Sequence, residues 1–211
     1  LKYLKEFREK GNPLKLSFPN GVMIDRLDRE HLFAMKDAGT EIIYLPVESG
    51  ELKNLIAMNK PAAVEHLENT LQVAEWCKEA ELDAGAFFII GYPGGKVVKK
   101  SLQKIVIERY ADSILDGNDG SIWIKGEDEE SFMQTVDFAK KLVKAGVKYV
   151  TPLIATPYPG TNLYDICEKY GWLRRADFSS MVTTISYQNP KVEFINIDTP
   201  WCSAEEAFAR W

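Results

Sequence analysis

The chain has 211 residues, of which 45% are hydrophobic and 27% are charged, and its formal net charge is −5. The length suits one large domain or two small ones, and the composition is ordinary for a globular protein. The acidic balance argues against a broad nucleic-acid-binding surface. No apolar run reaches the roughly 18 residues that a membrane helix needs, so we expect no membrane partner.

Both ends of the chain have helical patterns. Residues 1–13 are polar and amphipathic and lack the apolar core of a secretion signal, which makes the cytoplasm the expected compartment. Residues 203–211 stop inside another helical pattern, and residue 1 is not Met. We therefore expect the sequence to be a piece of a longer protein.

The cysteines are Cys77, Cys167 and Cys202, and they are far apart in the sequence. No CxxC or CxxxCxxC spacing occurs, so the sequence predicts no thiolate metal site of its own. Cys77 and Cys167 fall within helical patterns, where buried structural thiols are the favoured interpretation.

Four segments have the continuous apolar character of buried parallel strands: 14–18, 41–47, 86–90 and 147–155. Helical patterns separate them. Asp28 is expected to cap one helix, which Gly39 ends, and Thr161 is expected to cap the last. Two further helices are expected around 64–74 and 132–143. The alternation of strand and helix favours a parallel sheet with right-handed crossovers.

A polar turn follows each predicted strand: PNG (19–21), ESG (48–50), GYPG (91–94) and TPYPG (156–160). Sheets of this kind bind ligands at the carboxyl ends of their strands, where the loops converge. The sequence therefore predicts a ligand site at these turns.

Residues 96–125 interrupt the spacing between the turns. Glu48 and Gly91 are 43 residues apart, whereas Gly91 and Pro157 are 66 apart. We interpret 96–125 as an insertion with a basic amphipathic helix, a turn and a short strand. Long loops at this face often act as lids or partner sites, and a packed surface addition is an equally good interpretation.

Glu48 follows an apolar strand directly, where its charge needs a partner. Its carboxylate could accept two ribose hydroxyls or pair with an amine, and Ser49 adds a small donor. The alternative is a bridge from Glu48 to a neighbouring lysine. Ligand binding by Glu48 is the slightly favoured interpretation.

Gly91 would let the flat face of a ligand lie against the backbone and would leave neighbouring N–H and C=O groups free to bond a heterocycle. A plain turn between strand and helix is the alternative, and GYPG alone favours it. In TPYPGT, helix capping explains Thr161 well, whereas the two prolines around Tyr158 indicate a rigid turn.

Other candidates are weaker. His31 and His66 lie in helical patterns and are predicted to be surface or rim residues. Residues 116–127 are faintly similar to a calcium loop, but Ser121 stands where that loop requires glycine. The acidic run 126–131 suits a helix N-terminus.

Four motifs in order resemble the radical S-adenosylmethionine enzymes: LPVESG, FFIIGYPG, GEDEESF and TPYPGTNLYDICEKYGW. They are most similar to the branch that often carries an upstream cobalamin-binding domain, as is the tail VEFINIDTPWCSAEEA. The resemblance runs from about Pro13 to the C-terminus, apart from residues 96–125.

The resemblance implies an α/β fold, a partial TIM-like (β/α) barrel that binds S-adenosylmethionine across its strand ends. Positions that match Glu48 and Ser49 lie near the ribose and the methionine end in that family. The strand ending at Ile90, Gly91 and Tyr92 lies along the adenine. The remaining implied contacts are Asn20, after the first strand, and Ala155, Thr156 and Pro157, at the adenine edge.

Two departures from the family pattern limit what this chain can do. The CxxxCxxC loop that holds a [4Fe–4S] cluster is absent, as are the first two strands of the barrel. In addition, ESG is followed at once by ELKN, where the family usually has a longer SxxxLK stretch, and the insertion splits the usual GYPGE-ES join between Gly95 and Gly126. We therefore expect one partial barrel over 1–211, with a C-terminal extension over 176–211, whose catalysis needs the missing part.

Two alternatives remain at this level. The chain could be a truncated barrel that serves as a binding or assembly module, with a homodimer closing the bare strand edge at 14–18. It could also be an aldolase-like barrel, but the available lysines, Lys15 and Lys148, do not lie at carboxyl ends of strands. The substrate, and any use of cobalamin through an upstream domain, are not encoded in these motifs.

Overall fold

The computed structural model of the chain describes residues 1–12, 14–60, 62–116, 121–174 and 191–211. The chain divides into two compact units. The first unit comprises Leu1–Gly50, Val64–Phe88 and Val136–Thr151. The second unit comprises Glu51–Ala63, Ile89–Thr135 and Pro152–Trp211.

A four-stranded sheet has the order β1-β2-β3-β7, and its strands are β1 (Leu16–Phe18), β2 (Thr40–Glu48), β3 (Asp83–Ile90) and β7 (Tyr149–Ile154). β2 pairs in parallel with both β1 and β3. The predicted α/β class with a parallel sheet is confirmed, and each strand lies within a few residues of its expected bounds. No strand among the described residues joins β1 to β7, so closure into a barrel is not shown.

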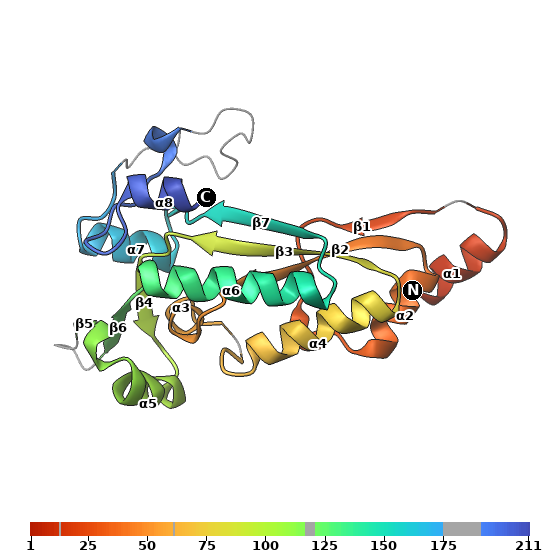
Figure 1. Ribbon diagram of the computed structural model, residues 1–211, viewed down its shortest axis with the longest axis horizontal. Helices are drawn as coiled ribbons and strands as arrows, with labels where there is room; N and C mark the ends of the chain where they lie inside the picture. Colours follow the sequence, from red (N-terminus) through yellow and green to blue (C-terminus); the bar gives the residue numbers. More distant parts are fainter. Residues whose placement is uncertain (13, 61, 117–120, 175–190) are drawn as a thin grey trace. The chain divides into compact units, whose positions relative to one another are not determined.

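Two helices of the first unit pack against β2, namely α2 (Arg29–Asp37) and α4 (His66–Glu79) (Figure 1). Their apolar faces meet the strand in one buried cluster, which includes Leu32, Ile43 and Val73. The carboxylate of Asp28 accepts a hydrogen bond from the backbone N–H of His31 at 2.8 Å, which confirms the predicted helix cap.

His66 requires a correction. It was predicted at the surface or rim, but it is only 3% exposed, and its Nε2 lies 3.2 Å from the backbone oxygen of Val47. The helical pattern had been read from Val64, whereas α4 begins at His66 and leaves Val64 48% exposed. His31 is exposed, as predicted.

Helix α1 (Lys2–Glu9) has no buried residue. Polar contacts within the first unit attach it: Lys5 pairs with the Asp37 carboxylate at 2.6 Å, and Arg8 donates to the backbone oxygen of Asp37 at 2.9 Å. The short 3-10 helix η1 (Ile24–Arg26) follows β1 and contacts α4.

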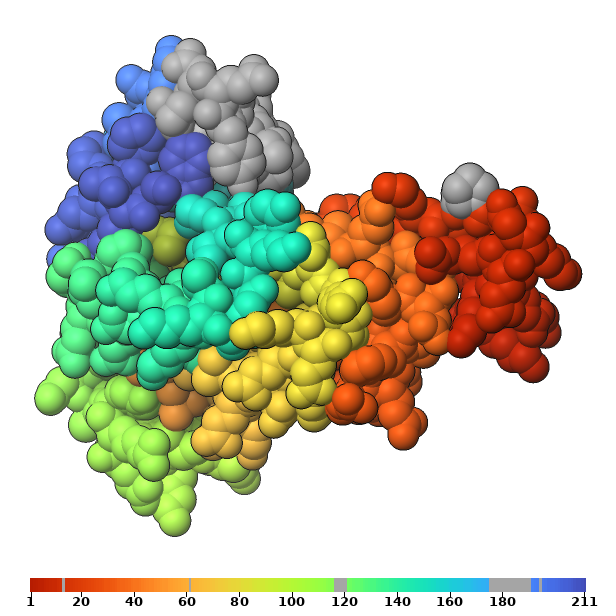
Figure 2. Space-filling model, turned by 45° about the vertical axis from the view of Figure 1, so that its right-hand side comes forward, coloured from red at the N-terminus to blue at the C-terminus, as the bar shows by residue number. Residues whose placement is uncertain are grey.

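A second, antiparallel sheet lies in the second unit. Its order is β4-β6-β5, with β4 (Gly94–Val97), β5 (Ile114–Asp116) and β6 (Ile122–Lys125). The connection from β4 to β5 contains α5 (Lys100–Arg109) and the 3-10 helix η2 (Ala111–Ser113). Figure 2 shows the surface of this segment in yellow-green.

The sequence predicted one strand in this segment, and the structure has three. Glycine is a poor strand former, so Gly94 and Gly95 gave no strand signal. A Cβ at Gly95 would overlap the carbonyl oxygen of Ala57, and one at Gly94 would overlap that of Ile124. The close approach of other backbone segments selects glycine here in spite of its propensity.

Two further helices of the second unit flank this sheet in the sequence. Helix α3 (Leu52–Ala57) was not predicted, and Glu51 caps it by accepting from the N–H of Asn54 at 3.1 Å. Helix α6 (Glu129–Ala145) begins in the second unit and continues into the first, where Phe138 and Leu142 join the buried apolar cluster.

The C-terminal part of the second unit contains α7 (Asn162–Lys169), η4 (Val192–Phe194) and α8 (Ala204–Arg210). The hydroxyl of Thr161 accepts from the N–H of Tyr164 at 3.2 Å, so the predicted cap of α7 is confirmed. Ser203 and Glu206 form a reciprocal capping box at the start of α8.

All three cysteines are buried, which confirms the interpretation of Cys77 and Cys167. Within the described ranges, no helix has both the length and the apolar character that a membrane crossing requires. Residues 117–120 of the segment that was compared with a calcium loop, and residues 176–190 of the predicted C-terminal extension, lie outside the described residues.

Candidate ligand-binding site

The predicted site residues are distributed over both units. Asn20, Glu48 and Ser49 belong to the first unit, and the other six belong to the second.

Glu48 ends β2 in a left-handed backbone conformation, with φ of 67°. The register between β2 and β3 shifts between Pro46 and Glu48, so the strand bulges as it ends. Ser49 is fully buried, and its N–H donates to the carbonyl of Val47 at 2.8 Å. A non-glycine residue in this conformation is strained, and such strain clusters at functional sites.

Asn20 lies in the exposed turn after β1. The following residues run beside β2: the N–H of Val22 donates to the carbonyl of Tyr44 at 3.0 Å, and a Cβ at Gly21 would lie 3.4 Å from Pro46. Within the first unit, the structure therefore brings the turn that carries Asn20 alongside the last residues before Glu48.

In the second unit the ends of β3 and β7 meet. The N–H of Ala155 donates to the carbonyl of Ile90 at 2.9 Å. Ala155 is buried in an apolar cluster, and Tyr92 packs against the same cluster. Three of the predicted contacts, Ile90, Tyr92 and Ala155, are thus brought together.

The backbone of the GYPG turn is held from within the protein. The N–H of Gly91 donates to Glu127 Oε1 at 2.9 Å. The carbonyls of Tyr92 and Pro93 accept from the N–H groups of Glu127 and Gly126, at 2.8 and 3.1 Å. The expectation that this turn leaves its backbone groups free is wrong for these three groups.

The packing of helix α8 explains why position 91 is a glycine. Gly91 is buried with φ of 71°, and a Cβ added there would lie 3.1 Å from the Cβ of Ala207. The conformation and the close approach of α8 both favour glycine at this position. No ligand is needed to account for it.

Glu127 is a site residue that sequence reasoning missed. Its side chain is fully buried, and Oε2 has no hydrogen-bond partner among the described residues. Burial raises the pKa of Glu127 to about 7, although the Gly91 N–H and the Arg210 guanidinium both act to lower it. One sequence signal could have identified Glu127. If the inserted residues 96–125 are omitted, GEDEES follows GYPG almost directly, and Glu127 then lies close to Gly91 in the sequence.

Arg210, in α8, contacts the Glu127 carboxyl and three neighbouring side chains. Its Nη1 lies 3.7 Å from Glu127 Oε1 and donates to the sulfur of Cys202 at 3.1 Å, and its Nη2 donates to Glu129 at 2.8 Å. The guanidinium also lies over the ring of Phe132, 5.1 Å from its centroid. The C-terminal helix is thereby fixed to the start of α6.

The TPYPGT turn mainly begins a helix. The hydroxyl of Thr156 donates to the carbonyl of Ile154 at 3.2 Å, and that of Thr161 donates to the carbonyl of Tyr158 at 2.7 Å. Pro157 is buried, whereas Tyr158 is 37% exposed. Helix capping accounts for Thr161, in line with the alternative weighed for this motif.

The lysines of the aldolase-like alternative are paired. Lys15 lies 2.7 Å from Glu41, and Lys148 lies 2.5 Å from Asp83. Lys15 precedes β1 and Lys148 precedes β7, so both lie at the amino ends of strands. Neither is placed for catalysis at a carboxyl end.

The described residues do not fit an iron–sulfur cluster. They contain no group of three or more His, Cys, Asp or Glu side chains that could hold a metal. Burial raises the pKa of each cysteine thiol to about 12, which disfavours the thiolate that ligates iron. A cluster would need ligands from outside this sequence.

Among solved structures, the chain matches that of TsrM from Kitasatospora setae, a radical S-adenosylmethionine methyltransferase with cobalamin and a [4Fe–4S] cluster bound. The TM-score is 0.53 and the sequence identity is 14%. The match covers 99% of this chain and 33% of the TsrM chain, so this chain spans about one third of that protein. At this identity the likeness shows a shared fold alone.

No family model matches the sequence, and no curated protein matches it. The comparisons therefore show a shared fold and nothing finer.

Proposed function

We propose that this chain is the later part of the core of a radical S-adenosylmethionine enzyme and binds S-adenosylmethionine at the residues that follow its parallel strands. The observation that carries the proposal is the fold match to a radical S-adenosylmethionine methyltransferase over 99% of the chain. The motif order LPVESG, FFIIGYPG, GEDEESF and TPYPGT supports it from the sequence.

Each residue would contribute ordinary binding chemistry. The carboxylate of Glu48 would accept from ribose hydroxyls or pair with the ammonium of the methionine end, and Ser49 and Asn20 would add polar contacts. The backbone of Ile90–Tyr92 would lie along the adenine. Ala155, Thr156 and Pro157 would meet the adenine edge.

The complete protein would supply the rest. In the family, a reduced [4Fe–4S] cluster would pass one electron to S-adenosylmethionine, whose C5′–S bond would break to give methionine and a 5′-deoxyadenosyl radical. The cluster ligands would come from a part outside this sequence, and cobalamin, which TsrM binds, would be held by an upstream domain. This chain alone, after iron–sulfur reconstitution, should form no 5′-deoxyadenosine, and its formation would contradict our assignment of what is missing.

Binding can be tested on the chain itself by calorimetry with S-adenosylmethionine. Glu48→Gln should weaken binding by about tenfold or more, because a charged hydrogen-bond partner is lost. Glu65→Gln is the matched control, since Glu65 is exposed and its side chain makes no cap bond to α4. The proposal fails if S-adenosylmethionine does not bind at millimolar concentration or if Glu48→Gln binds it as well as the parent chain.

A second candidate function is a non-catalytic assembly module. β1 is at one end of the strand order, so one of its edges is unpaired within the described sheet. Unpaired edges invite pairing with another chain, and a homodimer would cover this one. Size-exclusion chromatography with light scattering should then give a dimer, and Ser17→Pro on β1 should convert it to a monomer.

A further inference from the structure

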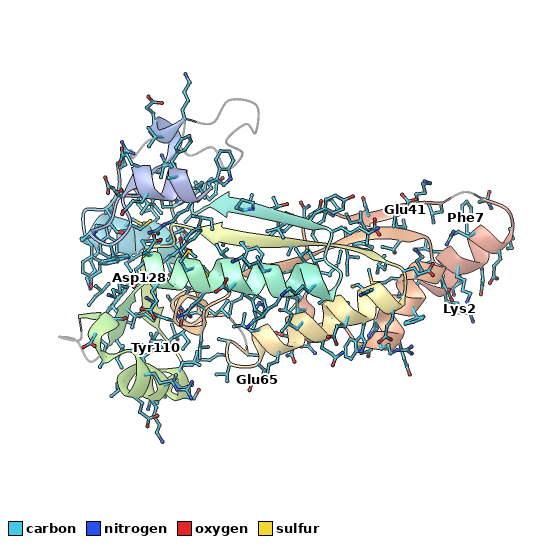
Figure 3. All side chains as sticks on the ribbon, viewed as in Figure 1. Lys2, Phe7, Glu41, Glu65, Tyr110 and Asp128 are labelled. Atoms are coloured by element: carbon cyan, nitrogen blue, oxygen red, sulfur yellow. The ribbon has the colours of Figure 1, made fainter. Side chains whose placement is uncertain are left out.

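A polar hollow of about 310 Å³ lies entirely within the second unit. One wall comes from the inserted segment, with Tyr110 and Asp112 after α5 and Lys125 at the end of β6. The opposite wall comes from α3 and the start of α6, with Lys53 and Asp128. Figure 3 labels Tyr110, which follows α5, and Asp128, which precedes α6.

The buried part of the hollow is made of charges that neutralise one another. Lys53, with a side chain only 7% exposed, donates to Asp128 at 2.9 Å. Burial would raise the pKa of Asp128, but its hydrogen bonds with Lys53 and Ser131 outweigh this and hold it at about 2. Tyr110 donates its hydroxyl to Glu51 at 3.0 Å, and burial and the Glu51 charge both raise the pKa of Tyr110.

The exposed part of the hollow carries charges of both signs that are not neutralised. Arg109, Asp112 and Glu130 line it, and within the described residues their side chains form no hydrogen bond or ion pair. Lys125 has one ion pair, to Asp128, at a distance of 3.8 Å. These side chains are therefore available to a ligand.

We propose that this hollow binds a small zwitterion of the free α-amino-acid class. A carboxylate would pair with Arg109 or Lys125, and an ammonium would pair with Asp112 or Glu130. A ligand of one sign would leave the opposite charges uncompensated. The volume is at the lower end of the range of ligand pockets, roughly 300–1,000 Å³, and the charged lining suits a polar rather than an apolar ligand.

The inserted segment, residues 96–125, would form one wall of this binding site. Strands β4 and β6, at the two ends of this segment, pair with each other, with Gly94 opposite Lys125. The two ends of the segment therefore lie side by side. The segment contributes Arg109, Asp112 and Lys125 to a hollow whose other wall belongs to the surrounding framework. The segment therefore completes a binding site, and its residues determine which ligand binds. None of the residues of the proposed S-adenosylmethionine site lines this hollow.

The test uses the intact chain and a panel of free α-amino acids at millimolar concentration, with ligand-observed NMR as the readout. At least one amino acid should bind, and acetate and methylamine, each with one charge, should bind at least about tenfold more weakly. Arg109→Gln and Asp112→Asn should each weaken the binding by about tenfold. Lys104→Gln, on the exposed side of α5, is the matched control and should change nothing.

Three results would overturn the proposal: no binding by any amino acid to a chain with a native circular dichroism spectrum, binding of methylamine as tight as that of the amino acid, or binding insensitive to both pocket substitutions. Amino-acid binding should also persist in Glu48→Gln. If S-adenosylmethionine fails to bind while an amino acid binds, the proposed function fails and this inference stands. If Asp112→Asn abolishes S-adenosylmethionine binding, the two sites are one and the inference falls.

Discussion

The turns after β2 and β3 follow the same pattern in the sequence, but their backbone conformations have different explanations in the structure. Gly91, after β3, has a left-handed backbone that glycine adopts without strain, and it is covered by Ala207 and bonded to Glu127. Glu48, after β2, holds a similar left-handed φ of 67° with a side chain that pays a steric penalty for it. Local structure explains the glycine, whereas the glutamate keeps the left-handed conformation in spite of its side chain.

Glu127 holds the turn after β3 by accepting a hydrogen bond from the Gly91 N–H. Its pKa of about 7 in the folded chain lies above the ordinary value of 4.5, so the folded state keeps a proton that the unfolded state has lost. The free energy of unfolding should therefore fall as pH rises from about 4.5 to about 7, by about 3 kcal/mol.

Urea denaturation across this pH range measures the effect. Glu127→Gln should remove this part of the pH dependence, because the neutral amide can still accept from the Gly91 N–H. Glu129→Gln, which removes a carboxylate that is 73% exposed, should retain it. A parent chain whose stability rises over this range relative to Glu127→Gln would show that the carboxylate is stabilised and not strained by its burial.

Gly91→Ala tests whether α8 explains the glycine. We expect a loss of about 2 kcal/mol in unfolding free energy, from the left-handed backbone together with the crowding against Ala207. Gly171→Ala is the matched control, because Gly171 has nearly the same φ, 70°, and no atom within 4 Å of an added Cβ. Adding Ala207→Gly should recover the part of the loss that exceeds the control, and no recovery would mean that α8 does not crowd this position.

Thr161→Ala addresses the third corner, after β7. Losing the cap of α7 should cost about 1 kcal/mol in unfolding free energy. S-adenosylmethionine affinity should stay the same, because the hydroxyl is committed to the backbone of Tyr158 and Tyr164. A clear loss of affinity with intact α7 would give Thr161 a binding role that the structure does not suggest.

Sequence reasoning correctly predicted those features of the fold that depend on residues close together in the sequence. The parallel strands, the caps at Asp28 and Thr161 and the buried Cys77 and Cys167 follow from apolar runs, capping chemistry and helical spacing. Strand β4 was missed because its glycines are selected by the backbones of Ala57 and Ile124, which are distant in sequence. His66 was misplaced because the buried face of α4 includes polar residues, His66 and Thr70, which an apolar pattern does not mark.

The candidate site was predicted less completely than the fold. Residues at strand ends could be named from the order of elements, but their partners could not. The bond from Gly91 to Glu127 joins residues 36 positions apart across the inserted segment, and the contact with Ala207 involves a helix at the other end of the unit's sequence. Such contacts depend on packing, which has no periodic signature along the chain.

Glu48→Gly tests the turn after β2, and we expect only a small change in stability. Glycine removes the penalty of the left-handed conformation but adds freedom to the unfolded chain, so a net gain of about 0.5 kcal/mol in unfolding free energy is expected. Glu81→Gly is the matched control, since Glu81 is exposed in the same unit with φ of 53°. Both variants should gain stability in urea denaturation, and only Glu48→Gly should lose S-adenosylmethionine binding in calorimetry. If Glu48→Gly instead destabilises the chain, the glutamate serves the fold, and the strain at this corner carries no argument for a ligand.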